Sequence, residues 1–248
     1  EVSVERVDGA WQPVLRRQVL ADGGSAYELR LPGEKDWRPF LSFGFEDTMS
    51  ASSPAGFTRD GQWLYGSLST GEDLPRFVRW SRKHLRTCGT TCQPELVHRS
   101  ATGALGVSHS DIKTGEPTVL MEVDLRGRRV VLDPALQPDL NALTKLAGSN
   151  EFSIVDNDLK DRLWLVALGS DQQGDEYWLW DRDQKQQRKL FSVQPRLDDY
   201  DLAPMESLDL KARDGRRLPA DLTRTPNAGG APITVTTLSP ASKPRPIC

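Results

Sequence analysis

A pattern of alternating turn and strand signals occurs twice in this chain, about 100 residues apart. This repeat restricts the possible folds more than any other feature of the sequence. Each copy has a polar turn, a short apolar strand, a polar loop and a second strand that ends in an aromatic residue. The first copy covers residues 56–80, and the second covers 152–180 with a further turn and strand at 181–191. Such repetition is typical of β-propellers, whose blades are small twisted sheets of roughly 40–50 residues.

Short strand patterns separated by turn signals fill most of the remaining sequence. We expect strands at residues 1–7, 11–17, 26–31, 37–45, 105–109, 119–124 and 128–132. Residues 133–148 break this pattern, because Leu140, Leu143 and Leu146 lie on one face of a helix that can start at Pro138 and end at Gly148. The sequence therefore predicts an all-β fold, a partial β-propeller of four-stranded antiparallel blades with one short inserted helix.

The composition is that of an ordinary water-soluble protein, with 27% charged residues, 37% hydrophobic residues and a net charge of −3 over 248 residues. No basic stripe predicts binding to nucleic acid, and no apolar run reaches the ~20 residues of a membrane helix. We therefore expect neither a nucleic-acid partner nor a membrane partner. Three cysteines fit a reducing compartment without excluding the periplasm, so the localisation stays open between cytoplasm and periplasm.

A hairpin is predicted near the C-terminal end. Residues 207–211 and 218–222 have strand patterns, and Arg213-Asp-Gly-Arg216 separates them. Asp-Gly between two such runs is a hairpin signal, because glycine adopts a positive φ without a Cβ clash.

The sequence around this hairpin resembles a known junction between domains. Leu202-Ala-Pro-Met205, Lys211-Ala-Arg-Asp-Gly215 and Leu218-Pro-Ala-Asp-Leu222 resemble the segment that joins a β-propeller to an α/β-hydrolase domain in the prolyl oligopeptidase family of serine peptidases. Upstream, Val131-Leu-Asp-Pro134, the predicted helix, the blade through Phe191 and then Arg196-Leu197 follow one another as in bacterial acylaminoacyl-peptidase-like members. The resemblance covers residues 103–226.

The resemblance implies a division into three parts. Residues 1–205 would be the propeller portion, 206–226 the junction with the first strands of an α/β-hydrolase domain, and 227–248 a divergent, disordered tail. In the family, the propeller filters substrates by size while the hydrolase domain performs the chemistry. We therefore expect the substrate-gating part of a serine peptidase that lacks its catalytic domain, meets peptides only through that domain and is inactive alone. The alternative is a free-standing propeller that binds a protein or peptide.

The sequence offers no catalytic residues to assign. A serine hydrolase of this kind needs Gly-x-Ser-x-Gly, and the closest serine, Ser67 in Gly66-Ser67-Leu68, lacks the second glycine. We therefore assign no catalytic, cofactor-binding or metal-binding residue and expect no cofactor. His109, beside Ser108, Ser110 and Asp111, is interpreted as a strand-end histidine rather than as the base of a triad.

Two segments depart from the family pattern, residues 80–98 and 229–248, and frame changes in the coding sequence are one hypothesis for both. In the first, Cys88 and Cys92 with His84 and His98 offer the two sulfurs and two nitrogens of a zinc site. Their order is not a standard zinc spacing, so we favour a loop with incidental ligand types. An intraloop disulfide has no better support from the sequence.

The carboxylates are numerous and scattered through predicted turns. Solvated turns explain them better than a general acid–base pair does. The groups considered are Glu46 with Asp47, Glu72 with Asp73, Asp171 with Asp175 and Glu176, and Asp198 with Asp199 and Asp201.

Overall fold

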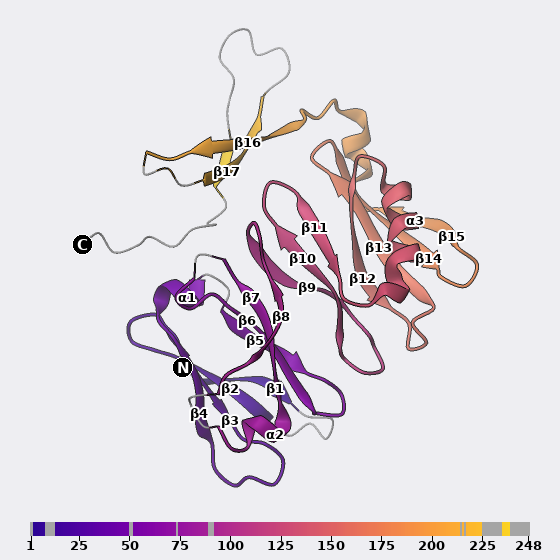
Figure 1. The fold of residues 1–248 in the computed structure, drawn as a ribbon. Helices are drawn as coiled ribbons and strands as arrows, with labels where there is room; N and C mark the ends of the chain where they lie inside the picture. The colour runs from indigo at the N-terminus through magenta and orange to yellow at the C-terminus, as the bar shows by residue number, and fades with distance from the viewer. Residues whose placement is uncertain are drawn as a thin grey trace. The chain divides into compact units, whose positions relative to one another are not determined.

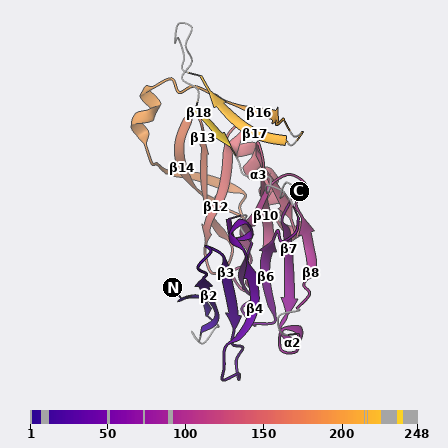
Figure 2. The same cartoon turned by 90° about the vertical axis from the view of Figure 1, so that its left-hand side faces the viewer.

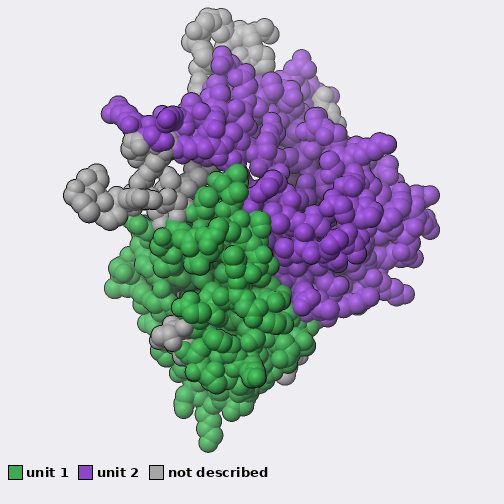
Figure 3. All heavy atoms as spheres, in the orientation of Figure 1, with its two compact units in different colours: residues 1–106, 240–248 green, residues 107–239 purple. Residues whose placement is uncertain are grey.

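The computed structural model describes residues 2–7, 13–49, 52–72, 74–88, 92–213, 215, 217–224 and 235–238, and for residues 2–7, 13, 198 and 235–238 it describes the backbone alone. The chain divides into two compact units. One comprises residues 1–106 and 240–248, and the other comprises residues 107–239 (Figure 3). Each unit is built from antiparallel sheets whose strands follow one another in sequence order, which is the topology of propeller blades.

The first unit holds two four-stranded sheets (Figure 1). The first sheet contains β1 (Val2–Val7), β2 (Pro13–Val19), β3 (Ser25–Leu29) and β4 (Arg38–Phe43), and the second contains β5 (Ser53–Phe57), β6 (Trp63–Leu68), β7 (Arg76–Ser81) and β8 (Glu95–Arg99). Two short helices, α1 (Phe45–Met49) and α2 (Arg82–Leu85), follow β4 and β7.

The core of the first unit lies between these two sheets. Leu15, Leu29 and Phe40 of the first sheet belong to one buried cluster with Leu64 and Trp80 of the second. The rings of Phe40 and Trp80 meet edge to face, with centroids 5.3 Å apart. Each sheet therefore buries one face against its neighbour, as consecutive blades do.

The second unit holds three sheets. Strands β9 (Ala104–Ser110), β10 (Pro117–Val123) and β11 (Gly127–Val131) form the first, and β12 (Glu151–Asn157), β13 (Leu163–Ser170), β14 (Gln173–Asp181) and β15 (Gln186–Ser192) form the second. The 3-10 turn η3 (Pro195–Asp199) leads to the third sheet, which contains β16 (Met205–Lys211), β17 (Arg217–Thr223) and β18 (Val235–Leu238) (Figure 2).

A helical insertion joins the first two of these sheets. Asp133 caps the 3-10 turn η2 (Pro134–Leu136) by accepting a hydrogen bond from the amide of Ala135 at 3.0 Å. Helix α3 (Gln137–Ala147) follows and ends at Gly148, whose φ of +61° favours glycine. The apolar face of α3, with Leu140, Leu143 and Ala147, packs in the same buried cluster as Trp164 and Trp180. Figure 1 shows α3 lying along the sheet of β12–β15.

The structure confirms the predicted fold class of antiparallel blades with the inserted helix α3, and it adds the two short helices α1 and α2. The predicted hairpin is also present, since β16 and β17 pair from Met205↔Thr223 to Lys211↔Arg217. Among the described residues, no helix is long and apolar enough to cross a membrane.

Residues 80–98 depart from the family pattern in sequence, but a strand still follows α2, since Glu95–Arg99 forms β8 and completes the second sheet. Val235–Leu238 lies within the tail that was predicted to be disordered, but it forms strand β18. This strand pairs with β17 from Thr223↔Val235 to Ala220↔Leu238 and so extends the edge of an existing sheet. The rest of residues 227–248 lies outside the described residues. The division of the chain into a propeller portion, a junction and a tail, with boundaries after residues 205 and 226, stays a prediction.

Candidate functional site

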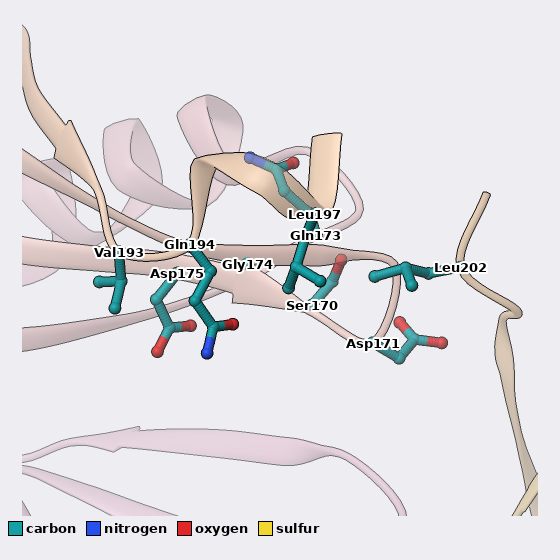
Figure 4. Close-up of a pocket in the computed structure, with 9 residues that line it drawn as sticks. All are labelled: Ser170, Asp171, Gln173, Gly174, Asp175, Val193, Gln194, Leu197 and Leu202. Carbon is teal, nitrogen blue, oxygen red and sulfur yellow. The ribbon is translucent and has the colours of Figure 1, made fainter. Parts of the chain in front are cut away.

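A pocket at one end of the sheet of β12–β15 is the candidate binding site (Figure 4). It has a volume of about 250 Å³. The β13–β14 turn, the start of β14, the chain from β15 into η3 and the segment before β16 supply its walls. The lining residues are Ser170, Asp171, Gln173, Gly174, Asp175, Val193, Gln194, Leu197 and Leu202.

The pocket forms because η3 packs directly on the start of β14. The amide of Val193 donates to the carbonyl of Asp175 at 2.8 Å, which holds the end of β15 beside β14. A Cβ on Gly174 would lie 3.4 Å from Cβ of Gln194 and 3.5 Å from Cδ1 of Leu197. These are ordinary van der Waals distances, so the start of β14 and η3 lie in direct contact at this position.

The segment that leads into β16 borders the other end of the pocket. The side-chain amide of Gln172 donates to the carbonyl of Leu202 at 3.2 Å, and the amide of Met205 donates to the carboxylate of Asp171. Figure 4 shows Asp171 and Leu202 at this end, and Asp175, Val193 and Gln194 at the opposite end. The β13–β14 turn thus fixes the path of the chain between the last four-stranded sheet and the β16–β17 hairpin.

The hairpin itself is fastened to the β10–β11 turn. Nη1 of Arg217 lies 2.7 Å from Oδ2 of Asp124, and Nε of Arg217 lies 2.7 Å from Oδ1 of Asp209. Hydrogen bonds to these two carboxylates, Asp209 first, raise the pKa of Arg217 above its ordinary value. The hydroxyl of Ser207 has two acceptors within hydrogen-bond distance, Oδ1 of Asp221 at 3.0 Å and the carbonyl of Leu125 at 3.3 Å.

The lining of the pocket favours binding over covalent catalysis. Its polar side chains are the carboxylates of Asp171 and Asp175, the amides of Gln173 and Gln194, and the hydroxyl of Ser170. These groups offer many hydrogen-bond acceptors to a ligand that carries donors. Among the described residues that line the pocket there is no histidine or lysine, the bases that usually activate a serine nucleophile.

The structure places His109 inside the second unit. Its side chain is 6% exposed and its Nδ1 lies 2.6 Å from the hydroxyl of Thr118, which is equally buried. That hydroxyl also donates to the carbonyl of His109, so it accepts from Nδ1–H, and Nε2 faces Oδ1 of Asp161 at 3.9 Å. Because Nδ1–H of His109 donates to the hydroxyl instead of accepting its proton, and both residues are buried, the three groups are not arranged as a nucleophile, a base and an orienting acid. His109 is therefore a buried structural histidine.

Three of the four residues considered as zinc ligands lie together. The ligand atoms of His84, Cys88 and Cys92 are within 4.8 Å of one another, and the two cysteines form a disulfide. His98 lies on β8 opposite Phe77 and is not part of this cluster. The disulfide differs from the sequence-based interpretation, which gave an intraloop disulfide no better support than a zinc site.

Of the carboxylates considered in the sequence analysis, Asp171 and Asp175 both line the pocket. The other described carboxylates do not line it. Glu72 pairs with Arg76 at 3.1 Å and also with Arg99. Burial alone would raise the pKa of Glu176, but hydrogen bonds from Lys189 and Trp178 outweigh it and hold the pKa below its ordinary value. Asp73 and the side chain of Asp198 lie outside the described residues.

Comparison with known proteins gives two curated relatives. Dipeptidyl aminopeptidase BIII of Pseudoxanthomonas mexicana is 31% identical over 203 residues, which cover 82% of this chain and 28% of that protein. Dipeptidyl peptidase family member 6 of Caenorhabditis elegans is 23% identical over 201 residues, which cover 80% of this chain and 26% of that protein. No family model matches the chain.

A solved prolyl endopeptidase has a similar fold. The TM-score is 0.50 at 12% sequence identity, and the match covers 86% of this chain and 31% of that structure. The matches cover between 26% and 31% of the length of these three proteins.

Proposed function

The chain belongs to the prolyl oligopeptidase family of serine peptidases, in which it corresponds to the propeller portion, and we propose that this portion controls which peptides reach a hydrolase domain. On this proposal the residues described here perform no bond cleavage. They form a barrier of rigid blades that admits short peptides, and the hydrolase domain supplies the nucleophile, the base and the oxyanion-stabilising groups.

The sequence match to a dipeptidyl aminopeptidase, 31% identity over 203 residues, carries the proposal. The blades and the β16–β17 hairpin support it, since the hairpin begins where the junction sequence begins and is tied to the preceding sheets through Asp171 and Asp124. These contacts lie where a linker between two domains would join the propeller portion. Both curated relatives carry a peptidase name, so we propose peptides as the substrates.

The first test measures whether residues 1–248 hold an active site. The purified chain should not hydrolyse chromogenic aminoacyl or dipeptidyl substrates, and a fluorophosphonate probe should not label it. Stoichiometric labelling of one serine, with loss of turnover when that serine is replaced, would contradict the proposal.

The second test supplies a catalytic domain. Residues 1–226 are fused to the hydrolase domain of the Pseudoxanthomonas relative, and cleavage of a dipeptidyl substrate is compared with cleavage of a peptide of about 30 residues. We expect the fusion to cleave the short substrate and to reject the long one, while the hydrolase domain alone discriminates less. A fusion that folds and cleaves both lengths equally would argue against gating, and peptide binding by the chain alone would favour a free-standing binding propeller.

A further inference from the structure

The loop that follows α2 gathers three metal-ligand side chains that the proposed function does not use. They are the imidazole of His84 and the sulfurs of Cys88 and Cys92. Two cysteines and one histidine with an open fourth position form one of the donor sets that zinc adopts in proteins. In the structure the two sulfurs are joined to each other, so neither is available as a thiolate.

Local helical geometry places His84 and Cys88 on the same side of the chain. Ser81 caps α2 by accepting from the amide of His84 at 3.2 Å. The amide of Cys88 donates to the carbonyl of His84 at 3.1 Å, which continues the helical turn to the cysteine. Residues four positions apart on a helix lie one above the other, so the two ligand atoms face the same space.

Tertiary contacts fix the third ligand and the loop around it. The indole of Trp80, itself 1% exposed, donates to the carbonyl of Cys92 at 3.2 Å. Leu85 is fully buried in the core of the first unit, and the guanidinium of Arg38 donates to its carbonyl. The side chain of Arg86 donates to the carbonyl of Pro32 at 2.8 Å. None of these contacts involves a sulfur atom, so we expect them to remain when the disulfide is opened.

We propose that reduction of the Cys88–Cys92 disulfide converts this loop into a site for one zinc ion, held by Sγ of Cys88, Sγ of Cys92 and a ring nitrogen of His84. A dithiol or phosphine reductant supplies the two electrons and is itself oxidised, and the two sulfurs take up two protons to become thiols. Binding of Zn²⁺ releases those two protons and forms two zinc–sulfur bonds and one zinc–nitrogen bond, with water in the fourth position. This proposal goes beyond the sequence analysis, which assigned no metal-binding residue.

The charge balance supports the assignment. Two thiolates and a neutral imidazole cancel the charge of Zn²⁺, so the complex adds no net charge. A neutral complex suits a position that is backed by the core through Cys92, which is 7% exposed, and flanked by the basic Arg82, Lys83 and Arg86. The ligand atoms already lie within 4.8 Å of one another, so the sulfurs need only separate to the spacing around a tetrahedral ion.

The experiment uses the whole chain in a Cys248→Ser background, so that only the two loop cysteines remain. Protein reduced with a phosphine is titrated with Co²⁺ under nitrogen, and Zn²⁺ then displaces the cobalt. We expect one Co²⁺ per chain with thiolate-to-cobalt absorption, and no such absorption from the oxidised protein. Cys88→Ser and Cys92→Ser should each weaken binding by at least about 100-fold, and His84→Ala by at least about tenfold.

Two controls separate metal binding from loss of fold. His98→Gln, which changes the histidine outside the cluster, should leave the cobalt spectrum and affinity unchanged. Far-ultraviolet circular dichroism of each loop variant should match that of the parent. A reduced, folded chain that binds no Co²⁺, or that binds it equally well after Cys88→Ser or His84→Ala, would overturn the assignment and leave the disulfide as a structural link. This inference does not depend on the proposed peptidase role.

Discussion

Replacement of Asp139 by alanine is expected to destabilise the second unit by about 3 kcal/mol. Asp139 lies on α3 and is 2% exposed. Its carboxylate accepts from the indole of Trp180 at 2.9 Å, from Nζ of Lys185 at 2.6 Å and from Nε of Arg182 at 3.1 Å. These three bonds attach the inserted helix to the sheet of β12–β15.

The magnitude follows from what each partner loses. Trp180 is 3% exposed and would keep a buried donor without an acceptor, which costs about 1–3 kcal/mol. Arg182 retains the carboxylate of Asp161, and the side chain of Lys185 is 51% exposed, so it turns to water at little cost. Only Trp180 is left without a partner, so we take the upper end of its range, about 3 kcal/mol, where it meets the lower end of the roughly 3–5 kcal/mol seen when one member of a buried ion pair is removed. Asp139→Asn keeps an oxygen for Trp180 and should cost about half as much.

The same carboxylate predicts a pH dependence. Burial alone would raise its pKa, but the hydrogen bonds from Lys185, Trp180 and Arg182 outweigh burial and hold the pKa of Asp139 below the usual aspartate value. A carboxyl group with a lowered pKa in the folded state stabilises the protein above its unfolded pKa, and that stabilisation is lost as the pH falls through the folded value. The difference between the parent and Asp139→Ala should therefore shrink below about pH 4.

Urea unfolding at pH 7, followed by tryptophan fluorescence and circular dichroism, measures the effect. Lys145→Ala on the exposed side of the same helix is the matched control and should change stability by no more than about 0.5 kcal/mol. If Asp139→Ala and Lys145→Ala lose the same small amount, the carboxylate does not hold the helix and the reasoning fails.

Three further predictions concern the buried His109, the closely packed Gly66 and the secondary-structure content of the chain. Burial, together with Arg182, lowers the pKa of His109 against the opposing effect of Asp161 and Asp111. Protonation therefore opposes folding, and stability should fall as the pH drops below about 6.5. His109→Gln should remove that part of the pH dependence, and an unchanged profile would refute this role. Gly66→Ala would bring a Cβ within 3.0 Å of the carbonyl of Ser53 and 3.1 Å of the ring of Trp80, and should cost about 1–3 kcal/mol in urea unfolding. Gly106→Ala, with open space around its Cβ position, is the control that should cost less. Circular dichroism should show mainly β structure, and a helix content near the ~30–35% of average domains would contradict the blade architecture.

Local sequence patterns determined the secondary structure and the class of fold. Alternating apolar residues and polar turns predicted most strands, and the spacing of Leu140 and Leu143 with Gly148 after them predicted α3. Arg213-Asp-Gly-Arg216 predicted the β16–β17 hairpin. These features could be predicted from the sequence because a turn or an amphipathic face depends on residues within a few positions of one another. The junction sequence also indicated the family.

Tertiary structure alone decided which side chains meet. The pocket combines Asp171 with Leu202, and the Asp139 network joins α3 to residues more than 40 positions away. No local pattern records such a pairing, because it depends on how whole sheets and the inserted helix pack. The same reason explains why the sequence grouped His98 with the two cysteines, whereas the fold keeps only His84 beside them. Strand β18 forms on the edge that β17 presents, and its own sequence, rich in threonine, gives no signal of that edge.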